Sequence, residues 1–105
     1  MTTVNPLELR SLLQSQPSMV LLNVRPADTD MQDCLPRSLH VPLSDLEARA
    51  ATLLPDKDAS IALYGADLTC EASTKGSLML EKLGYKNIYN FTAGLKAWKE
   101  AGFSH

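Results

Sequence analysis

The stretch SIALYGADLTCEASTKGSLMLEKLG, residues 60–84, contains the pattern that decides the fold. Residues 60–64 are almost all apolar and predict a buried strand, which is followed by a polar loop at residues 65–72. A helix is then predicted from residues 73–74 to Gly84, a residue type that often ends helices. A buried strand that leads through a loop into a helix is typical of an α/β fold with a parallel sheet.

The same alternation continues on the N-terminal side of this stretch. A helix is predicted to open with Asn5 as its cap and Glu8 in the capping-box position. Residues 19–24 are nearly all apolar and predict a second buried strand. A long polar connection over residues 25–38 then leads to a short predicted strand at residues 39–41.

Helices and strands also alternate through the rest of the chain. Ser44 and Glu47 form another capping-box pattern and predict a helix that begins there. Residues 87–91 predict a further strand, and residues 95–101 predict a last helix. We therefore expect an α/β fold with a parallel sheet and helices on its faces. Ligand sites in such sheets lie beyond the carboxyl ends of the strands, so the loop at residues 65–72 is where chemistry is expected.

Composition limits the class of protein. The 105 residues suit one domain spanning residues 1–105, and 45% of them are apolar and 21% charged. The net charge of −2 argues against a broadly basic nucleic-acid surface. No apolar run approaches the ~20 residues that span a bilayer, and the N-terminus lacks a signal-peptide pattern. We expect a cytoplasmic protein in which Cys34 and Cys70 are reduced thiols.

Three segments together resemble the rhodanese homology family. Residues 21–25, LLNVR, are similar to that family's Asp-Val-Arg strand end, and residues 34–43, CLPRSLHVPL, are similar to its Gly-His-Ile-Pro-Gly-Ala-x-x-x-Pro-Leu stretch. Residues 84–98 resemble its closing Gly-Phe-x-x-Val-x-x-Leu-x-Gly-Gly-x-x-x-Trp signature. The resemblance extends from Asn5 to Gly102 and implies a rhodanese-like three-layer fold.

The resemblance also implies a chemistry from which this sequence departs. Sulfurtransferases of the family carry a cysteine directly after the third predicted strand, where backbone N–H groups and a helix dipole stabilise its thiolate or persulfide. In this sequence Gly65 occupies that position, and glycine cannot form a persulfide. The loop is also longer than in those sulfurtransferases, and it contains Asp67 and Glu71 but no basic residue.

We therefore expect a rhodanese-like protein without sulfurtransferase activity that acts as a binding or regulatory module. The expected partner is a protein, and we expect no nucleic acid, membrane, cofactor or metal, with a monomer or weak dimer in solution. The expected recognition surface is the loop formed by Gly65, Ala66, Asp67, Leu68, Thr69, Cys70, Glu71, Ala72 and Ser73.

The alternative is an enzyme, a thiosulfate-type sulfurtransferase or sulfur carrier that uses Cys70 as its persulfide-forming nucleophile. Cys70 lies just before a predicted helix, whose N-terminus would lower the pKa of a thiol. The neighbouring Glu71 opposes that effect. Cys34 is expected to pack in a connection, and a redox pair between Cys34 and Cys70 is a further alternative, if their Cα atoms lie within about 7 Å.

Other polar residues are expected to have structural roles. Arg25 is expected to hold the connection that follows it through an acid such as Asp28 or Asp30, while Asn23 keeps hydrogen bonding without the charge of the family's Asp. His40 is expected to be a structural or surface histidine. The predicted core comprises Leu22, Val24, Val41, Leu46, Ile61, Leu63, Leu80, Leu83, Ile88 and Trp98.

Overall fold

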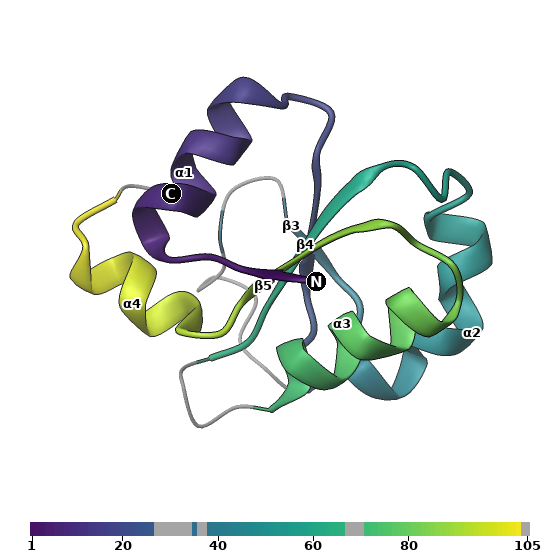
Figure 1. Cartoon of the computed structure of the whole chain (residues 1–105). Coiled ribbons are helices and arrows are strands. Elements are labelled where there is room, and N and C mark those ends of the chain that lie inside the picture. Colours follow the sequence, from purple (N-terminus) through teal and green to yellow (C-terminus); the bar gives the residue numbers. More distant parts are fainter. Residues whose placement is uncertain (27–34, 36–37, 67–70, 104–105) are drawn as a thin grey trace.

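A five-stranded parallel sheet with the strand order β1-β5-β4-β2-β3 forms the centre of the molecule (Figure 1). The structure is a computed structural model that describes residues 1–26, 35, 38–66 and 71–103. Its strands are β1 (Thr2–Thr3), β2 (Val20–Asn23), β3 (Ser38–His40), β4 (Ser60–Tyr64) and β5 (Asn87–Phe91). Its helices are α1 (Pro6–Ser15), α2 (Leu43–Leu53), α3 (Ala72–Lys82) and α4 (Gly94–Glu100).

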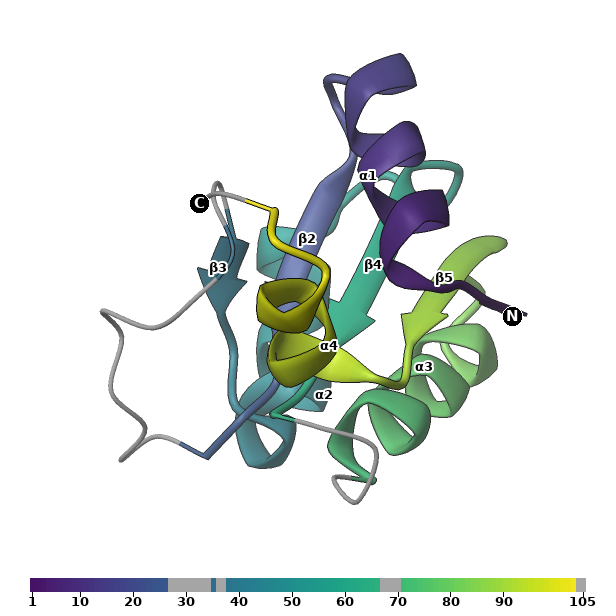
Figure 2. The ribbon, with the colours of Figure 1, turned by 90° about the vertical axis from the view of Figure 1, so that its left-hand side faces the viewer.

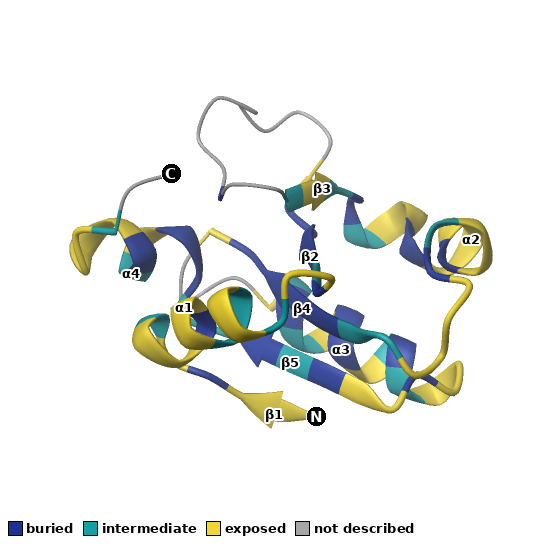
Figure 3. Ribbon diagram, turned by 90° about the horizontal axis from the view of Figure 1, so that it is seen from above, coloured by how far each residue is buried: buried dark blue, intermediate teal, exposed yellow. Residues whose placement is uncertain are grey.

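The helices cover both faces of the sheet, which gives the three layers expected from the sequence (Figure 2). Strand residues alternate between the two faces because successive side chains in a strand point in opposite directions. In β4, Ile61 and Leu63 join the buried cluster against α2 and α3. Ala62 and Tyr64 join the cluster against α1 and α4. Figure 3 shows that the strands in the middle of the sheet are buried while the outer sides of the helices are exposed.

Most of the predicted elements are confirmed, including the capping box of α1, in which Asn5 and Glu8 each accept from the other's backbone N–H. Gly84 follows α3 with a φ of 102°, as its predicted helix-ending role requires. The strand β1 was not predicted, since two threonines are too short to form a pattern. Among the described residues, no helix is long and apolar enough to cross a membrane.

The predicted cap of the second helix is wrong. α2 begins at Leu43 with Pro42 as its N-cap, and Ser44 lies inside the first turn. The backbone N–H of Leu43 donates to Val24 O at 3.3 Å, and that of Asp45 donates to Pro42 O at 2.8 Å. These bonds start the helix one residue before Ser44, so its hydroxyl is not needed as a cap.

Nine of the ten predicted core residues are buried, and Leu83 is the exception. Leu83 is the C-cap of α3 and is 37% exposed, because it lies beyond the turns of the helix that pack on the sheet. The sheet-facing residues of α3 are Ser73, Gly76, Ser77 and Leu80. They include small residues, which let the helix approach the sheet closely.

Candidate functional site

The carboxyl ends of β2 and β4 form the candidate site. These strands are neighbours, with Asn23 opposite Tyr64, and the chain leaves them in opposite directions across the sheet. β2 is followed by β3 on one side, whereas β4 is followed by β5 on the other. In open α/β sheets, ligands bind in the crevice at such a switch point. Arg25 follows β2 and Gly65 follows β4, so both residues lie at this crevice.

The start of the 65–72 loop is fixed to α4 by two backbone hydrogen bonds. Leu95 N donates to Gly65 O, and Lys96 N donates to Ala66 O, each at 3.0 Å. The first N–H groups of a helix have no partner within the helix, so they commonly bind acceptors from outside it. Here these two amides already bind the loop backbone, and Gly65 is buried beneath them.

The far end of the loop is described from Glu71 onward. Ala72 and Ser73 were predicted as loop residues, and this is wrong, because α3 begins at Ala72 with Glu71 as its N-cap. Glu71 is exposed at the N-cap position of α3, its side chain forms no capping hydrogen bond, and it pairs with Lys75 at 3.4 Å. Ser73 is fully buried, and its Oγ has no hydrogen-bond partner among the described residues. The predicted site residues Asp67, Leu68, Thr69 and Cys70 lie outside the described residues, as do Cys34, Asp28 and Asp30.

Arg25 is buried and tied to the strand that it ends. Its backbone N–H and its Nε both donate to Asn23 Oδ1, at 3.0 and 3.3 Å. His40 Nε2 lies 2.8 Å from Arg25 O, and since a carbonyl only accepts, Nε2 is the donor. The predicted hydrogen-bonding role of Asn23 and the structural role of His40 are therefore confirmed.

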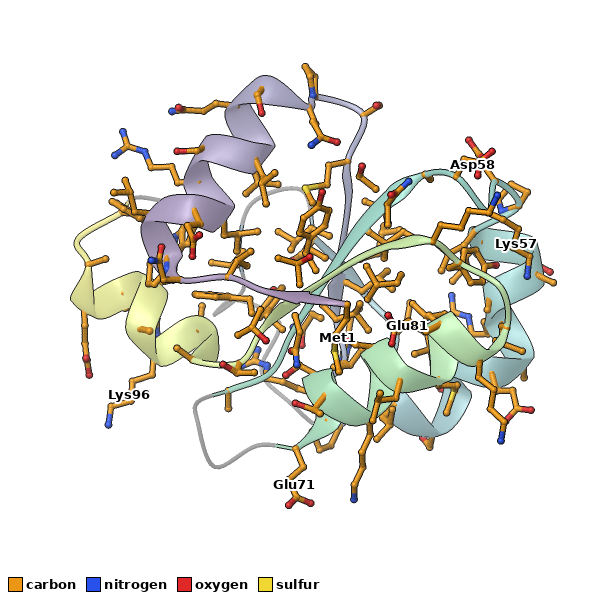
Figure 4. The ribbon with its side chains drawn as sticks, viewed as in Figure 1. Met1, Lys57, Asp58, Glu71, Glu81 and Lys96 are labelled. Carbon is orange, nitrogen blue, oxygen red and sulfur yellow. The ribbon has the colours of Figure 1, made fainter. Side chains whose placement is uncertain are left out.

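A basic hollow, which was not predicted from the sequence, lies beside the start of the loop. Its volume is about 220 Å³, and it is lined by Arg25, Ala66, Leu95, Lys96 and Lys99. Lys96 also lies 3.9 Å from Glu100, in an exposed pair. Figure 4 shows that Lys96 and Glu71 point outward at the same edge of the molecule, from α4 and from the start of α3.

The three cations of this hollow come from segments far apart in the sequence. The loop itself contains only acidic charges, so its sequence gave no sign of a basic neighbour. The available signal was the spacing of Lys96 and Lys99, which places both on one side of the last helix. In the part of the chain that the structure describes, no three His, Cys, Asp or Glu side chains come together as metal ligands would.

Comparison with known proteins identifies relatives of this chain. A family model described as the rhodanese-like domain matches residues 5–101. The rhodanese-like domain of the Alr3790 protein from Anabaena sp. is 27% identical, with a TM-score of 0.84 over 97% of this chain and 76% of that chain. No curated protein matches the chain.

Two sulfurtransferases are also similar to it in structure. The thiosulfate sulfurtransferase from Pseudomonas aeruginosa is 25% identical, with a TM-score of 0.80 over 97% of this chain and 19% of that chain. The human single-domain sulfurtransferase TSTD1 is 24% identical, with a TM-score of 0.80 over 95% of this chain and 96% of that chain. The likeness to the human protein shows a common fold.

Proposed function

Since the chain belongs to the rhodanese-like domain family, we propose that it is a binding module that docks a protein partner at the 65–72 loop and does not transfer sulfur. The observation that carries this proposal is the position of Gly65. It is the first residue after β4, where the family's sulfurtransferases have their cysteine, and it offers no side chain to hold sulfur.

The attachment of the loop to α4 supports the same proposal. A persulfide or an anionic donor is stabilised by backbone N–H groups that point at it. The amides of Leu95 and Lys96 instead donate to the carbonyls of Gly65 and Ala66. These two amides are therefore already occupied and do not point at a sulfur donor.

The charges at this edge favour a protein surface as the partner. The hollow at Ala66 is lined by basic side chains, whereas Glu71 is an exposed acid at the other end of the loop. A small anion fits only the basic end. A protein surface with an acidic and a basic patch fits both ends of the loop.

One observation favours the alternative in which Cys70 carries sulfur. Cys70 precedes α3 by two residues, and the side chain of Glu71, the N-cap residue of that eleven-residue helix, forms no capping hydrogen bond. Uncapped N–H groups at a helix N-terminus lower the pKa of a nearby thiol, which favours the nucleophilic thiolate. This second candidate is a sulfur carrier or sulfurtransferase that does not use the position of Gly65.

Intact mass after incubation with thiosulfate separates the two candidates. The binding module is expected to keep its mass, and thiosulfate:cyanide turnover is expected to stay at background. A gain of one sulfur atom that is lost in Cys70→Ala and kept in Cys34→Ser would establish the carrier and overturn the first proposal. The matched control is the P. aeruginosa thiosulfate sulfurtransferase under the same conditions.

A further inference from the structure

A second surface with its own chemistry lies between α2 and α3, in the helix layer rather than at the strand ends. It is a groove of about 550 Å³. Its lining residues are Glu47 of α2 and Lys75, Leu78, Met79, Lys82 and Leu83 of α3 and its C-cap. Figures 1 and 2 show these two helices next to each other on one face of the sheet.

The floor of this α2/α3 groove is apolar. Leu78 is 52% exposed and Leu83 is 37% exposed, and Met79 is half-buried. Single exposed leucines are ordinary on a protein surface. Here three apolar side chains line one hollow, so an apolar side chain of a partner can be removed from water there.

The rim formed by α3 is basic. Lys75 and Lys82 are seven residues apart, which places them on the same side of α3 and about 10 Å apart along its axis. Lys75 pairs with Glu71 at 3.4 Å, and because both side chains are largely exposed the pair is weak. Within the described residues, Lys82 forms no ion pair.

We propose that this groove docks an amphipathic helix of another protein, with two acidic residues seven positions apart flanking a leucine-type residue. A helix is favoured as the partner because of how the groove residues are spaced along α3. A lysine at position 75, two apolar residues at 78 and 79, and a second lysine at 82 follow one another at the helical spacing of three to four residues. A partner helix lying alongside α3 would repeat with that same period. Its acids would meet Lys75 and Lys82 while its apolar side chains fill the floor.

A second copy of this chain does not supply that helix. Of the four helices in the described residues, none has two acidic residues seven positions apart. The acids within α2, for example, are Asp45 and Glu47, which lie on different sides of that helix. The charge pattern of the groove therefore points to a different protein as the occupant.

Fluorescence anisotropy with two designed helical peptides of about 18 residues, roughly five turns, tests this proposal. One peptide has Glu at two positions seven apart with Leu between them, and the matched peptide has Lys at the same two positions. The Glu peptide is expected to bind the full chain with saturation, and the Lys peptide is expected not to bind. Salt is expected to weaken binding, because exposed ion pairs are screened.

Charge reversal in the protein supplies the decisive comparison. The double variant Lys75→Glu, Lys82→Glu is expected to bind the Glu peptide about tenfold more weakly and to gain binding of the Lys peptide. The control is Lys86→Glu, an exposed lysine that pairs with Asp58 outside the groove, and it is expected to leave binding unchanged. Leu78→Ser is expected to abolish binding of the Glu peptide, and thermal melts establish that each variant is folded.

Three outcomes overturn the proposal. The first is that the wild-type chain binds neither peptide, and the second is that it binds both equally. The third is concentration-dependent dimerisation that Leu78→Ser removes, because the occupant would then be a second copy of this chain. None of these outcomes bears on the thiosulfate experiment, which concerns the 65–72 loop alone.

Discussion

The hydroxyl of Tyr64 donates a hydrogen bond to Ser38 Oγ at 2.9 Å, and so joins the end of β4 to the start of β3 across the intervening β2. The same hydroxyl accepts from Leu35 N at 3.0 Å, and Ser38 Oγ donates to Leu35 O at 2.7 Å. Tyr64 is fully buried, and the bond from Leu35 N to its hydroxyl is buried as well. They fix the point at which the chain enters its edge strand.

Tyr64→Phe is expected to destabilise the protein by about 1–3 kcal/mol, because it leaves the buried N–H of Leu35 without its acceptor. Urea denaturation measures the change as a lower midpoint with an unchanged slope. Tyr89→Phe is the matched control, since Tyr89 is half-buried and no hydrogen bond of its hydroxyl is present among the described residues. Its cost is expected to stay below about 0.5 kcal/mol. Equal costs for the two variants would contradict a role for the Tyr64 hydroxyl.

Gly76 is expected to tolerate no larger residue, because α3 approaches the sheet closely at this point. A Cβ at this position would lie 2.8 Å from Leu63 Cδ2 and 3.2 Å from Leu46 Cδ2. Overpacking of this kind costs about 1–3 kcal/mol, which exceeds the gain of about 1 kcal/mol from replacing glycine by alanine in a helix. Gly76→Ala is therefore expected to lower the free energy of unfolding.

A double-mutant cycle tests whether the contact with Leu63 causes the destabilisation by Gly76→Ala. Leu63→Val removes the nearer methyl group, so Gly76→Ala is expected to cost less in that background than in the wild type. Additive costs would show that the contact with Leu63 is not the cause.

Burial raises the pKa of Tyr85, whose hydroxyl donates to Ala50 O and Leu54 O. A phenol with a pKa higher in the folded than in the unfolded state binds its proton more tightly when folded. Its contribution to stability is therefore complete below the unfolded pKa of about 10 and is lost as the pH rises through the folded pKa. Denaturation midpoints of the wild type are expected to fall above pH ~10.

Tyr85→Phe provides the control for that pH dependence. The variant keeps the aromatic ring, whose centre lies 4.1 Å from Lys57 Nζ, so this contact remains in both proteins. The alkaline fall in stability is expected to be smaller in the variant. Identical curves for the two proteins would exclude Tyr85 as its source.

The sequence predicted the layers of this fold because its apolar runs and helical stripes are local patterns. It mispredicted the start of α2, where a backbone bond from Leu43 to Val24 decides the boundary. It also placed Leu83 in the core, because helical periodicity does not reveal where the sheet beneath a helix ends. Boundaries of this kind depend on tertiary contacts, which no local pattern contains.

The candidate site was predicted only in part, for the same physical reason. Gly65 directly follows a predicted strand, which is a local feature of the sequence. The structure places Gly65 directly after β4, as expected. The basic hollow was missed because Arg25 and Lys96 meet only when α4 packs against the strand ends. The charged residues within the loop predicted only the acidic side chains of the site, and none of its basic side chains.

Gly65→Cys places a sulfur-carrying side chain at the position where the family's sulfurtransferases have their cysteine. Gly65 is not among the glycines with positive φ in the described residues, so its backbone conformation is one that a cysteine can adopt. Thiosulfate:cyanide turnover is nevertheless expected to remain near background, because the loop is long and holds Asp67 and Glu71, whose charges repel an anionic donor. The triple variant Gly65→Cys, Asp67→Ala, Glu71→Ala is expected to exceed Gly65→Cys in turnover. Full turnover by Gly65→Cys alone would show that the missing cysteine is the only barrier to sulfur transfer.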